Sequence, residues 1–435
     1  MKSRFLFHGF LLGHRARLIT GLLALLAANL VQAKPSGAEI EPLRVSLVST
    51  EGRTESFRAA LAKTLERTLG TGVTVTSAAK NADGTLSLAS LRSAHAAVFV
   101  RGPGPLGDGD TAELRSFLKA GKGSVILAAA RDKWDAVPGF FPEYLGAEPG
   151  GRFADGAPMS VINLFPHSIY TDVTRFETRQ PMLLWHKLAA DAQLIMEGTV
   201  GEDTTPLAWV RRRKTGRICH VVPAESALFS DASYLQIVAN AVLWSDGRAI
   251  PHAQPIVQRT FMPESYPGSF AITFPNGPGV CFDPVRGGIN FVWDGDFVDL
   301  RPRWLTKQGE PPRIFGKVFY REKAWQPLRE GAPTRDSEFR FRGYALKAGG
   351  PEFHYQIDGR DIFEAISANA QGTGITRRFR VGAGAGPLWI SLEPQTDAEI
   401  ALTGLVRDGD HATFASASAG EFTIEIRRKS GAAPL

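Results

Sequence analysis

The stretch that most constrains the fold of this chain is SVILAAA, residues 124–130, which is apolar after its first residue. Apolar residues on both faces are typical of a central strand in a parallel sheet that is covered on both sides. The run leads into a tight turn, a place where many α/β enzymes hold a nucleophile. Here that turn contains Ala128, Ala129 and Ala130. The sequence therefore predicts a buried parallel strand whose following turn lacks a nucleophile.

Strand patterns and helix patterns alternate around this run. The strand patterns are LRVSLVS (43–49), VTVTSA (73–78), HAAVFVRG (95–102) and the pair PLAWV and GRICHVV, which we expect to form a hairpin across RRRKT. The helix patterns are SFRAALAKTLERTL (56–69), AELRSFLKAG with Asp110 as its N-cap, and the amphipathic ASYLQIVANAVLWSDG. Short links between such elements indicate an α/β doubly wound domain of the flavodoxin or glutamine-amidotransferase type.

From Phe261 onward the chain shows short alternating strand patterns between Gly, Pro and Asp turns. FRFRGYALKAGGPEFHYQIDG predicts a hairpin, with Phe339, Phe341 and Tyr344 opposite Phe353, Tyr355 and Ile357. Such a series is typical of an all-β, sandwich-like domain. Breaker residues in SDGRAIPHAQPIVQRT indicate a linker. We therefore expect an α/β domain at 34–246, a linker at 247–260 and a β-rich domain at 261–435.

The N-terminus has the composition of a secretory signal. Basic residues precede the apolar LITGLLALLAANLV, and Val31-Gln32-Ala33 has small residues where signal peptidase requires them. We expect a signal peptide at 1–33 with cleavage after Ala33, although a retained anchor is the alternative. The expected location is periplasmic or secreted, with no membrane span after removal of the signal.

Charge and cysteine content argue against several classes of protein. Removing the four basic residues of the signal leaves 46 Lys and Arg against 44 Asp and Glu, or +2. We interpret the basic run 211–214 as a solvated hairpin or edge turn and expect no nucleic-acid partner. Cys219 and Cys281 are interpreted as buried thiols, with a disulfide as the alternative. No cofactor is expected, and His167 with His186 lacks the carboxylate that a metal site would need.

The segment AGKGSVILAAARDKW is similar to the AGGGxVGIHAA strand and turn of the ThuA-like, or trehalose-utilisation, family. FFPEYLGAEPGGRF and LFPHSIYTDV resemble two further segments of that family, and a helix ending NAVLW closes the region. The resemblance covers roughly residues 43–246. It implies a class I glutamine-amidotransferase-like fold and a saccharide-related function.

The chain departs from the family at the positions where that family places functional side chains. Ala128 stands in place of the family's His and of a glutaminase Cys, Arg152 replaces a second His, and Pro223 falls where a third is expected. An alanine methyl can neither attack a carbonyl nor accept a proton. Glutamine amidotransferase activity is therefore not expected, and any other enzyme activity is left open.

Polar and aromatic residues still follow the predicted strands, at the sheet edge where α/β proteins bind ligands. The candidate ligand-binding residues are Arg131, Trp134, Arg152, Trp185 and His186, and the candidate acid–base residues are Asp132, Glu225 and His167. Each also has a structural interpretation, such as core packing of Trp134 against Phe140. Three hypotheses follow: a saccharide-binding or accessory protein, a carbohydrate-active enzyme with unusual acid–base residues, or a structural module of a periplasmic or surface assembly.

Overall fold

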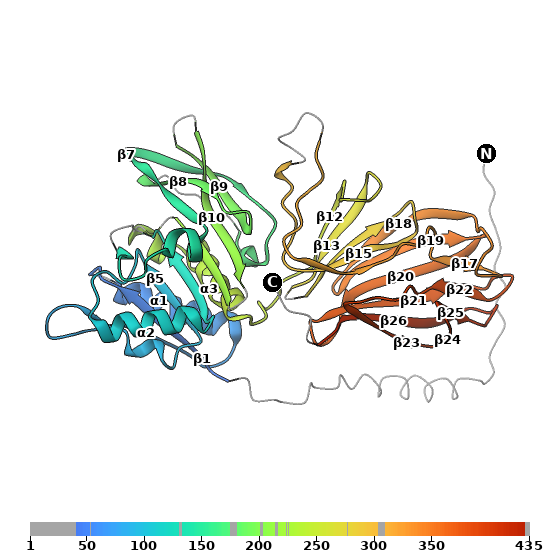
Figure 1. Cartoon of the computed structure of the whole chain (residues 1–435), viewed down its shortest axis with the longest axis horizontal. Coiled ribbons are helices and arrows are strands. Elements are labelled where there is room, and N and C mark those ends of the chain that lie inside the picture. Colours follow the sequence, from blue (N-terminus) through green and yellow to red (C-terminus); the bar gives the residue numbers. More distant parts are fainter. Residues whose placement is uncertain are drawn as a thin grey trace, which may run out of the picture. The chain divides into compact units, whose positions relative to one another are not determined.

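A nine-stranded mixed sheet organises the first half of the computed structural model, shown in blue to green in Figure 1. Its strand order is β2-β1-β5-β6-β11-β10-β9-β7-β8. The strands are β1 (Leu43–Ser49), β2 (Val73–Ser77), β5 (Ala96–Val100), β6 (Gly123–Leu127), β7 (Ala147–Leu164), β8 (Pro181–Leu188), β9 (Ala192–Val200), β10 (Asp203–Arg213) and β11 (Gly216–Val221). A separate hairpin pairs β3 (Ala79–Lys80) with β4 (Leu86–Ser87).

The structure describes residues 41–52, 54–129, 133–174, 181–200, 203–213, 216–222, 224, 226–275, 277–302 and 309–430. Within these ranges, the side chains of 151–159, 162, 181–184, 186, 187, 200 and 203 are outside the description. The expected signal peptide, residues 1–33, lies outside the described residues. None of the helices in the described ranges is long and apolar enough to cross a membrane.

The predicted central strand is present. All five residues of β6 are buried, and β6 pairs in parallel with β5 on one side and β11 on the other. The strands β2, β1, β5, β6 and β11 run parallel, whereas β10, β9, β7 and β8 extend the sheet in antiparallel fashion. The expected hairpin of β10 with β11 is confirmed, with Trp209 opposite His220. Sequence patterns did not predict the antiparallel extension through β7, β8 and β9.

Three helices accompany this sheet: α1 (Glu55–Leu69), α2 (Asp108–Lys119) and α3 (Ala232–Asp246). Phe57, Leu61 and Leu65 of α1 are buried on one face, as the helical spacing predicts. The proposed N-cap of α2 is wrong, because the helix begins at Asp108 and the Asp110 carboxylate accepts the amide of Leu88 instead. Short helical turns lie at η1 (Ala89–Leu91), η3 (Phe140–Leu145, a π-helix), η4 (Ser168–Tyr170) and η5 (Ser226–Ser230).

The closing helix α3 is buried on every side rather than amphipathic, which corrects the sequence-based interpretation. Every residue from Tyr234 to Ser245 is buried. The helix packs against β5, β6 and β11 and also against α1 and η4, so it has no solvent face. Its buried polar groups are satisfied, since Asn240 donates to the carbonyls of Ile169 and Thr171.

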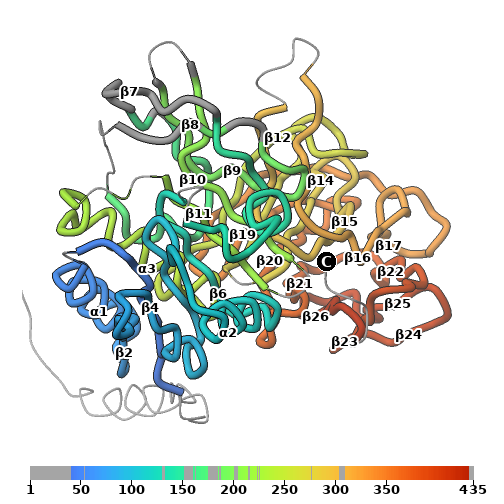
Figure 2. The backbone as a smooth tube through the Cα atoms, turned by 60° about the vertical axis from the view of Figure 1, so that its left-hand side comes forward, coloured from blue at the N-terminus to red at the C-terminus, as the bar shows by residue number. Residues whose placement is uncertain are grey.

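Three antiparallel sheets form the β-rich region, yellow to red in Figure 1. The five-stranded sheet contains β12 (Ile256–Thr260), β13 (Ser269–Thr273), β14 (Gly279–Asp283), β15 (Gly288–Asp294) and β16 (Lys317–Arg321). The six-stranded sheet contains β18 (Phe339–Lys347), β19 (Gly350–Ile357), β20 (Arg360–Ala368), β21 (Gly374–Val381), β26 (Gly420–Arg428) and β23 (Ala398–Thr403). The four-stranded sheet contains β17 (Leu328–Glu330), β22 (Leu388–Ser391), β25 (His411–Phe414) and β24 (Val406–Asp408), and the last three lie together in Figures 1 and 2.

One hydrophobic core joins these three sheets. It contains Phe282 of the five-stranded sheet, Ile390 of the four-stranded sheet and Phe353 of the six-stranded sheet. The predicted hairpin of 339–357 is confirmed, with Phe339 opposite Ile357 and Tyr344 opposite Phe353. Strand β12 falls inside the expected linker 247–260, and residues Leu43–Leu435 form one compact unit by their contacts. The proposed domain boundaries therefore stay predictions.

Candidate functional site

The turn after β6 retains the strained backbone that nucleophile-bearing turns adopt. Ala128 has φ of 45°, in the left-handed region that side chains other than glycine seldom occupy. Two hydrogen bonds hold the turn against β11: the Ala128 amide donates to the Val221 carbonyl at 2.7 Å, and the Ala129 amide to His220 Nε2 at 3.3 Å. The described part of the turn thus has a left-handed residue at Ala128, whose side chain is a methyl group.

His220, which the sequence did not single out as a candidate site residue, lies beside this turn. Its ring is fully buried, with Trp185 and Trp209 ring centroids at 4.8 and 4.1 Å. Burial holds the pKa of His220 well below its ordinary value of 6.5, so the ring is neutral at pH 7. Nε2 accepts the Ala129 amide, which places the proton on Nδ1. A neutral, enclosed imidazole supports the turn but has no route to bulk solvent as a base.

The two candidate tryptophans are packed in the core. Trp134 is 2% exposed and stacks on Phe140, with ring centroids 3.5 Å apart, while its Nε1 donates to the Arg101 carbonyl. Trp185 is also buried, between Phe141 and the His220 ring. Neither ring presents a free face on which a sugar could stack. The structural interpretation of Trp134, as packing beside Phe140, describes its position correctly.

Several other candidates cannot be placed. Arg131, Asp132 and Glu225 lie outside the described residues, as does Pro223. Arg152 belongs to β7 and His186 to β8, but their side chains are outside the description. These candidates stay predictions.

His167 is described, and it lies away from the turn after β6. It caps η4, accepting the Ile169 amide on Nδ1, as expected for a loop histidine. Its Nε2 lies 3.9 Å from Asp296 Oδ1, which is an ion-pair distance only if the ring is protonated. Burial, together with the nearby Arg212 and Arg217, lowers the pKa of His167 to about 4 against the opposing effect of Asp296. The ring is therefore neutral at pH 7.

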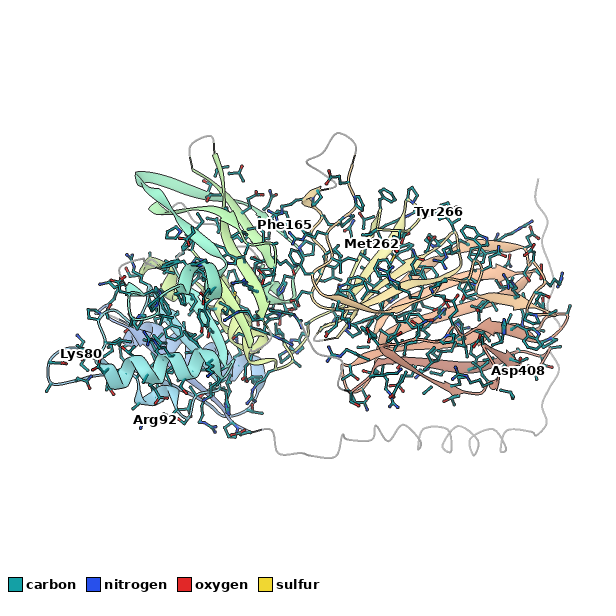
Figure 3. The ribbon with its side chains drawn as sticks, viewed as in Figure 1. Lys80, Arg92, Phe165, Met262, Tyr266 and Asp408 are labelled. Carbon is teal, nitrogen blue, oxygen red and sulfur yellow. The ribbon has the colours of Figure 1, made fainter. Side chains whose placement is uncertain are left out.

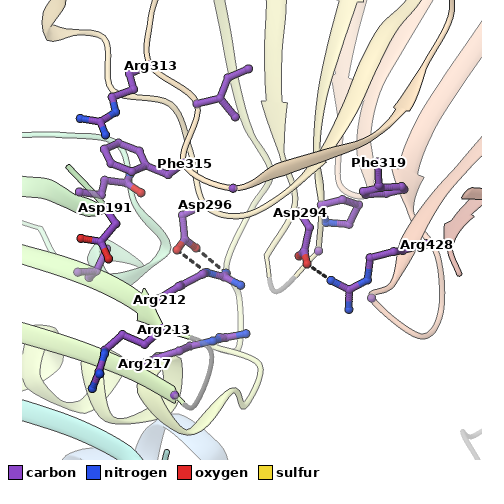
Figure 4. A pocket seen from close by; sticks show the side chains of 18 of the residues that line it. Asp191, Arg212, Arg213, Arg217, Asp294, Asp296, Arg313, Phe315, Phe319 and Arg428 are labelled. Carbon is purple, nitrogen blue, oxygen red and sulfur yellow. Dashed lines mark hydrogen bonds and ion pairs between the residues drawn. The ribbon is translucent and has the colours of Figure 1, made fainter. Parts of the chain in front are cut away.

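A large pocket in the described part of the chain lies at a different edge of the sheet from the one predicted. It has a volume of about 890 Å³, and Gly216 and Arg217, which begin β11, belong to its lining. It therefore opens near the amino end of this parallel strand, whereas ligands of α/β sheets are expected at the carboxyl ends. Arginines and aspartates from β10, β11, β15 and β26 face it (Figure 4): Arg212, Arg213, Arg217, Asp294 and Arg428, with Asp191, Asp296 and Arg313 from connecting segments.

Arg212 and Asp296 form the fixed part of this pocket. Arg212 Nε and Nη2 donate to the two carboxylate oxygens of Asp296 at 2.7 and 2.8 Å, a bidentate pair. Burial opposes ionisation of Asp296, but Arg212, His167 and Arg217 outweigh it and hold its pKa below the ordinary value. The basic run 211–214 is thus not merely solvated, because Arg212 binds a carboxylate far along the chain and Arg211 binds Asp191 and the carbonyls of 142–144.

Arg217 is a second half-buried guanidinium near the same carboxylate. It donates to the Trp244 carbonyl at 3.0 Å and lies 5.5 Å from the centroid of that ring. Burial and the neighbouring Arg212 lower its pKa to about 10, so it keeps its charge at pH 7. Two guanidinium groups thus lie near one carboxylate at the wall of the pocket, but of the two it is Arg212 that is hydrogen-bonded to it.

Charge in the pocket is unbalanced overall. Five arginines and three aspartates line it, and five minus three leaves a surplus of two positive charges. Asp294 is paired with Arg428, and Asp191 with Arg211, which is not itself part of the lining. Arg213 and Arg313 instead lie over the rings of Tyr144 and Phe315, at 4.2 and 5.3 Å. Within the described ranges, Arg213, Arg217 and Arg313 have no carboxylate partner.

Sequence patterns could not identify this pocket. Its residues come from positions 190 to 428, and only the run 211–213 stood out, as a charge cluster. The run WDGDF, which contains Asp294 and Asp296, has the local sequence of a hairpin turn, but that interpretation is wrong: β15 ends at Asp294 and its partner β16 begins only at Lys317, so Asp296 lies in a long connection. In the described ranges, no group of three or more His, Cys, Asp or Glu side chains is placed to hold a metal ion. Cys219 and Cys281 are both free and buried, which confirms the interpretation as buried thiols.

Comparison with known proteins gives only low similarity. No known family and no curated protein matches the chain. Among solved structures, a ThuA-like protein of Bacteroides uniformis aligns with TM-score 0.37 and 13% identity, over 48% of this chain and 94% of that chain. A ThuA-like protein of Parabacteroides merdae aligns with TM-score 0.36 and 11% identity, over 52% of this chain and 95% of the other.

An exo-β-1,4-mannosidase of an Opitutaceae bacterium aligns with TM-score 0.31 and 17% identity, over 48% of this chain and 36% of the mannosidase. Similarity at this level carries no argument about fold or function. The site is therefore interpreted from its own residues alone.

Proposed function

We propose that this protein is an exported binding or accessory protein whose ligand is an acidic saccharide held in the arginine-lined pocket. The observation that carries the proposal is the surplus of guanidinium groups around Arg217. A sugar carboxylate or sulfate would supply the anionic charge that the three aspartates do not.

The lining also suits the uncharged part of such a ligand. Phe315 lies half-buried in the wall, and Figure 4 shows its ring among the polar side chains that face the pocket. Ligand pockets commonly combine ring faces with a few charged groups that fix orientation, and volumes of about 300–1,000 Å³ are usual. A volume of about 890 Å³ leaves room for more than one sugar unit.

Binding rather than catalysis is supported by the turn after β6. Ala128 offers no nucleophile there, and His220 beside it is enclosed and neutral. Of the proposed acid–base residues, His167 is buried against Asp296 and Trp244 and does not belong to the pocket lining. The proposal includes export after cleavage at Ala33, supported by the N-terminal sequence. It also includes a doubly wound, ThuA-like domain, supported by the parallel strands around β6 and the strained turn.

A structural module in a periplasmic or surface assembly is the second candidate. The observation that favours it is the packing of Trp134 on Phe140, which fills the space beside the turn after β6 with aromatic rings. This candidate predicts no small-molecule ligand for the pocket.

Thermal-shift and calorimetric titrations of residues 34–435 separate the two candidates. Oligogalacturonate and sulfated oligosaccharides are compared with neutral oligosaccharides of the same length. A ligand that binds only the folded state raises the melting temperature. We expect a rise with the acidic sugars that weakens as salt is added, and none with the neutral ones at this pocket.

Substitution of a pocket arginine then tests whether the acidic sugars bind in the arginine-lined pocket. Arg217→Ala should weaken acidic-sugar binding at least tenfold, because it removes a guanidinium without a carboxylate of its own. The matched control is Arg340→Ala, an exposed arginine paired with Glu338 in β18, which should leave binding unchanged. Absence of binding by every acidic sugar, or equal binding by wild type and Arg217→Ala, would contradict the proposal and leave the structural module as the better candidate.

A further inference from the structure

A second pocket lies in the β-rich region, away from the arginine-lined pocket and sharing no residue with it. Its volume is about 610 Å³. Residues before β13, at the end of β14 and after β16 line it: Phe261, Glu264, Ser265, Tyr266, Pro267, Asp283, Arg286, Lys323 and Trp325. Figure 3 labels Tyr266 beside the strands of the five-stranded sheet. Nothing in the proposed function above uses these residues.

Two aromatic rings at this pocket are unusually exposed. Tyr266 is 45% and Trp325 is 47% exposed, and their ring centroids lie 5.5 Å apart with the planes at 61°. Of the eight tryptophans in the chain, Trp134, Trp185, Trp209, Trp244 and Trp293 are all at most 3% exposed. Single exposed apolar residues are common on protein surfaces, but adjoining exposed rings in a hollow are typical of a binding surface.

Hydrogen bonds from Asp283 and Arg286 hold the backbone beside both rings. The fully buried Asp283 carboxylate accepts the Tyr266 amide at 3.0 Å and also the amides of Val285 and Arg286. Arg286 Nη2 donates to the carbonyls of Glu322 and Ala324, directly before Trp325. These bonds fix the backbone on both sides of the pocket without covering either ring. Such a prepared surface loses little conformational entropy when a ligand binds.

Charge distinguishes this pocket from the arginine-lined one. Its lining has two acidic groups, Glu264 and Asp283, and two basic groups, Arg286 and Lys323, so the net charge is zero. Asp283 and Arg286 are occupied by backbone groups, and Glu264 pairs with Arg321 at 2.6 Å. The Lys323 ammonium and the Glu264 carboxylate lie at the exposed rim, where they can bind hydroxyl groups.

We propose that this pocket binds a neutral polysaccharide chain. The apolar C–H face of one pyranose would stack on Trp325, with Tyr266 against its edge, and the rim groups would bind hydroxyls of the same or the next sugar. The absence of surplus charge favours a neutral chain over an acidic one. The pocket would thus attach the protein to a glycan that differs from the ligand of the arginine-lined pocket.

Native affinity electrophoresis tests this inference with residues 34–435. Gels containing hydroxyethyl cellulose, galactomannan, mixed-linkage β-glucan or soluble starch are compared with a gel without polysaccharide. We expect retardation in at least one of the four. Trp325→Ala and Tyr266→Ala should each weaken the affinity at least tenfold, while Trp325→Phe keeps a ring and should lose less. Ligand addition should also shift tryptophan emission to shorter wavelength in wild type but not in Trp325→Phe.

The matched control is Tyr344→Ala, which removes a tyrosine of similar exposure, 48%, that does not line this pocket. It should be retarded as wild type is. Migration of wild type unchanged in all four gels, or equal retardation of wild type and Trp325→Ala, would overturn the inference. Loss of retardation in Arg217→Ala but not in Trp325→Ala would place the polysaccharide in the arginine-lined pocket and overturn the inference as well. Retardation by neutral chains without acidic-sugar binding would support this site while contradicting the proposed function.

Discussion

Two clusters of arginine and carboxylate in this molecule have opposite compositions. At the pocket wall, the guanidinium groups of Arg212 and Arg217 both lie near the single carboxylate of Asp296, which pairs with Arg212. Inside the β-rich core, the single guanidinium of Arg377 faces two carboxylates, those of Glu364 and Glu322. Arg377 Nε donates to Glu364 at 2.6 Å, whereas its Nη1 is 3.6 Å from Glu322, beyond hydrogen-bonding distance. One cluster lacks an anion, and the other lacks a cation.

Solvent access determines how the unpaired charge of each cluster can be compensated. Arg212 and Arg217 border a large pocket, from which an anion can complete the charge. Glu322 is sealed in the core, and within the described part of the chain neither of its oxygens has a hydrogen-bond partner. Burial, against the effect of Arg377 and together with that of Glu364, raises the pKa of Glu322 to about 7. Below about pH 7 a proton on Glu322 takes the place of the missing cation. The same side-chain types thus border an open pocket in one cluster and favour protonation in the other, according to access.

The largest effect is expected from removing the cation of the core cluster. Arg377→Met would leave Glu364 buried without its partner, and breaking a buried pair in this way costs about 3–5 kcal/mol. Urea unfolding should show a free energy of unfolding that is lower by that amount. Arg380→Met, in the same strand with a side chain that is 55% exposed, should change stability by no more than about 0.5 kcal/mol. Equal effects of the two substitutions would show that the core cluster contributes nothing.

The pH dependence of stability should separate the clusters next. Folded Glu322 keeps its proton up to about pH 7, whereas an ordinary Glu loses it near 4.5, so its contribution falls as pH rises through 4.5–7. His167 has the opposite sign: its pKa is about 4 when folded and 6.5 ordinarily, so its contribution rises with pH through 4–6.5. Across its pH range, each of these two groups changes the free energy of unfolding by roughly 3 kcal/mol. His220, also neutral by burial, adds to the His167 term.

Unfolding in urea at pH 4.5, 5.5 and 6.5 measures these slopes. Glu322→Gln removes the contribution of Glu322, which falls as pH rises. The free energy of unfolding of this variant should therefore rise with pH more steeply than that of wild type. His167→Asn removes the contribution of His167, which rises with pH, while it keeps a side-chain acceptor for the Ile169 amide. Its free energy of unfolding should therefore rise with pH less steeply than that of wild type. Parallel curves for the three proteins would contradict the assigned protonation states.

An intermediate effect is expected at the pocket wall. Asp296→Asn leaves Arg212 without a counter-charge and should cost about 1–3 kcal/mol, the range for a hydrogen bond to a charged group. The same change increases the positive surplus of the pocket, so acidic-sugar binding should become tighter while stability falls. Calorimetry and urea unfolding on one preparation measure both. A parallel loss of stability and affinity would show that Asp296 serves the ligand directly.

The smallest effect is expected at the turn after β6, where no charge is involved. Ala128→Gly relieves the left-handed strain of φ 45° and should raise stability by about 0.5–1 kcal/mol. Ala129→Gly, at the adjacent fully buried position that is not in the left-handed region, should lower stability by a similar amount. Thermal unfolding of the two variants and of wild type shows whether each substitution raises or lowers stability. Destabilisation by both substitutions would argue against stored strain at Ala128.

Sequence patterns predicted the elements that are defined by a short stretch of the chain. The hairpins β10–β11 and β18–β19, the buried strand β6 and the helix α1 all follow from periodicity and turn residues over short stretches. The same reasoning failed at α3, because all-round burial depends on α1 and η4, which are far away in the sequence. It also missed β7 to β9, whose register contains several irregularities that weaken alternation.

Candidate site residues were predicted at the carboxyl edge of the sheet, and the described ones do not gather there. Trp134 and Trp185 are core residues, and His167 lies beside Asp296. The residues that line the large pocket carried no joint signal, since a charge surplus depends on which side chains share a volume. The sequence likewise does not show that Asp283 and Arg286 hydrogen-bond to the backbone beside Tyr266 and Trp325.

By itself, the sequence determined the strand and helix patterns, the near-neutral charge of the expected mature chain and the absence of a nucleophile at Ala128. These properties are local or additive, so they can be read in order along the chain. Only the tertiary structure decided which charges meet. Arg212 and Asp296 are 84 residues apart, and Arg286 and Ala324 are 38 apart. Proximity sets both burial and electrostatic energy, and it exists only after the sheets have assembled.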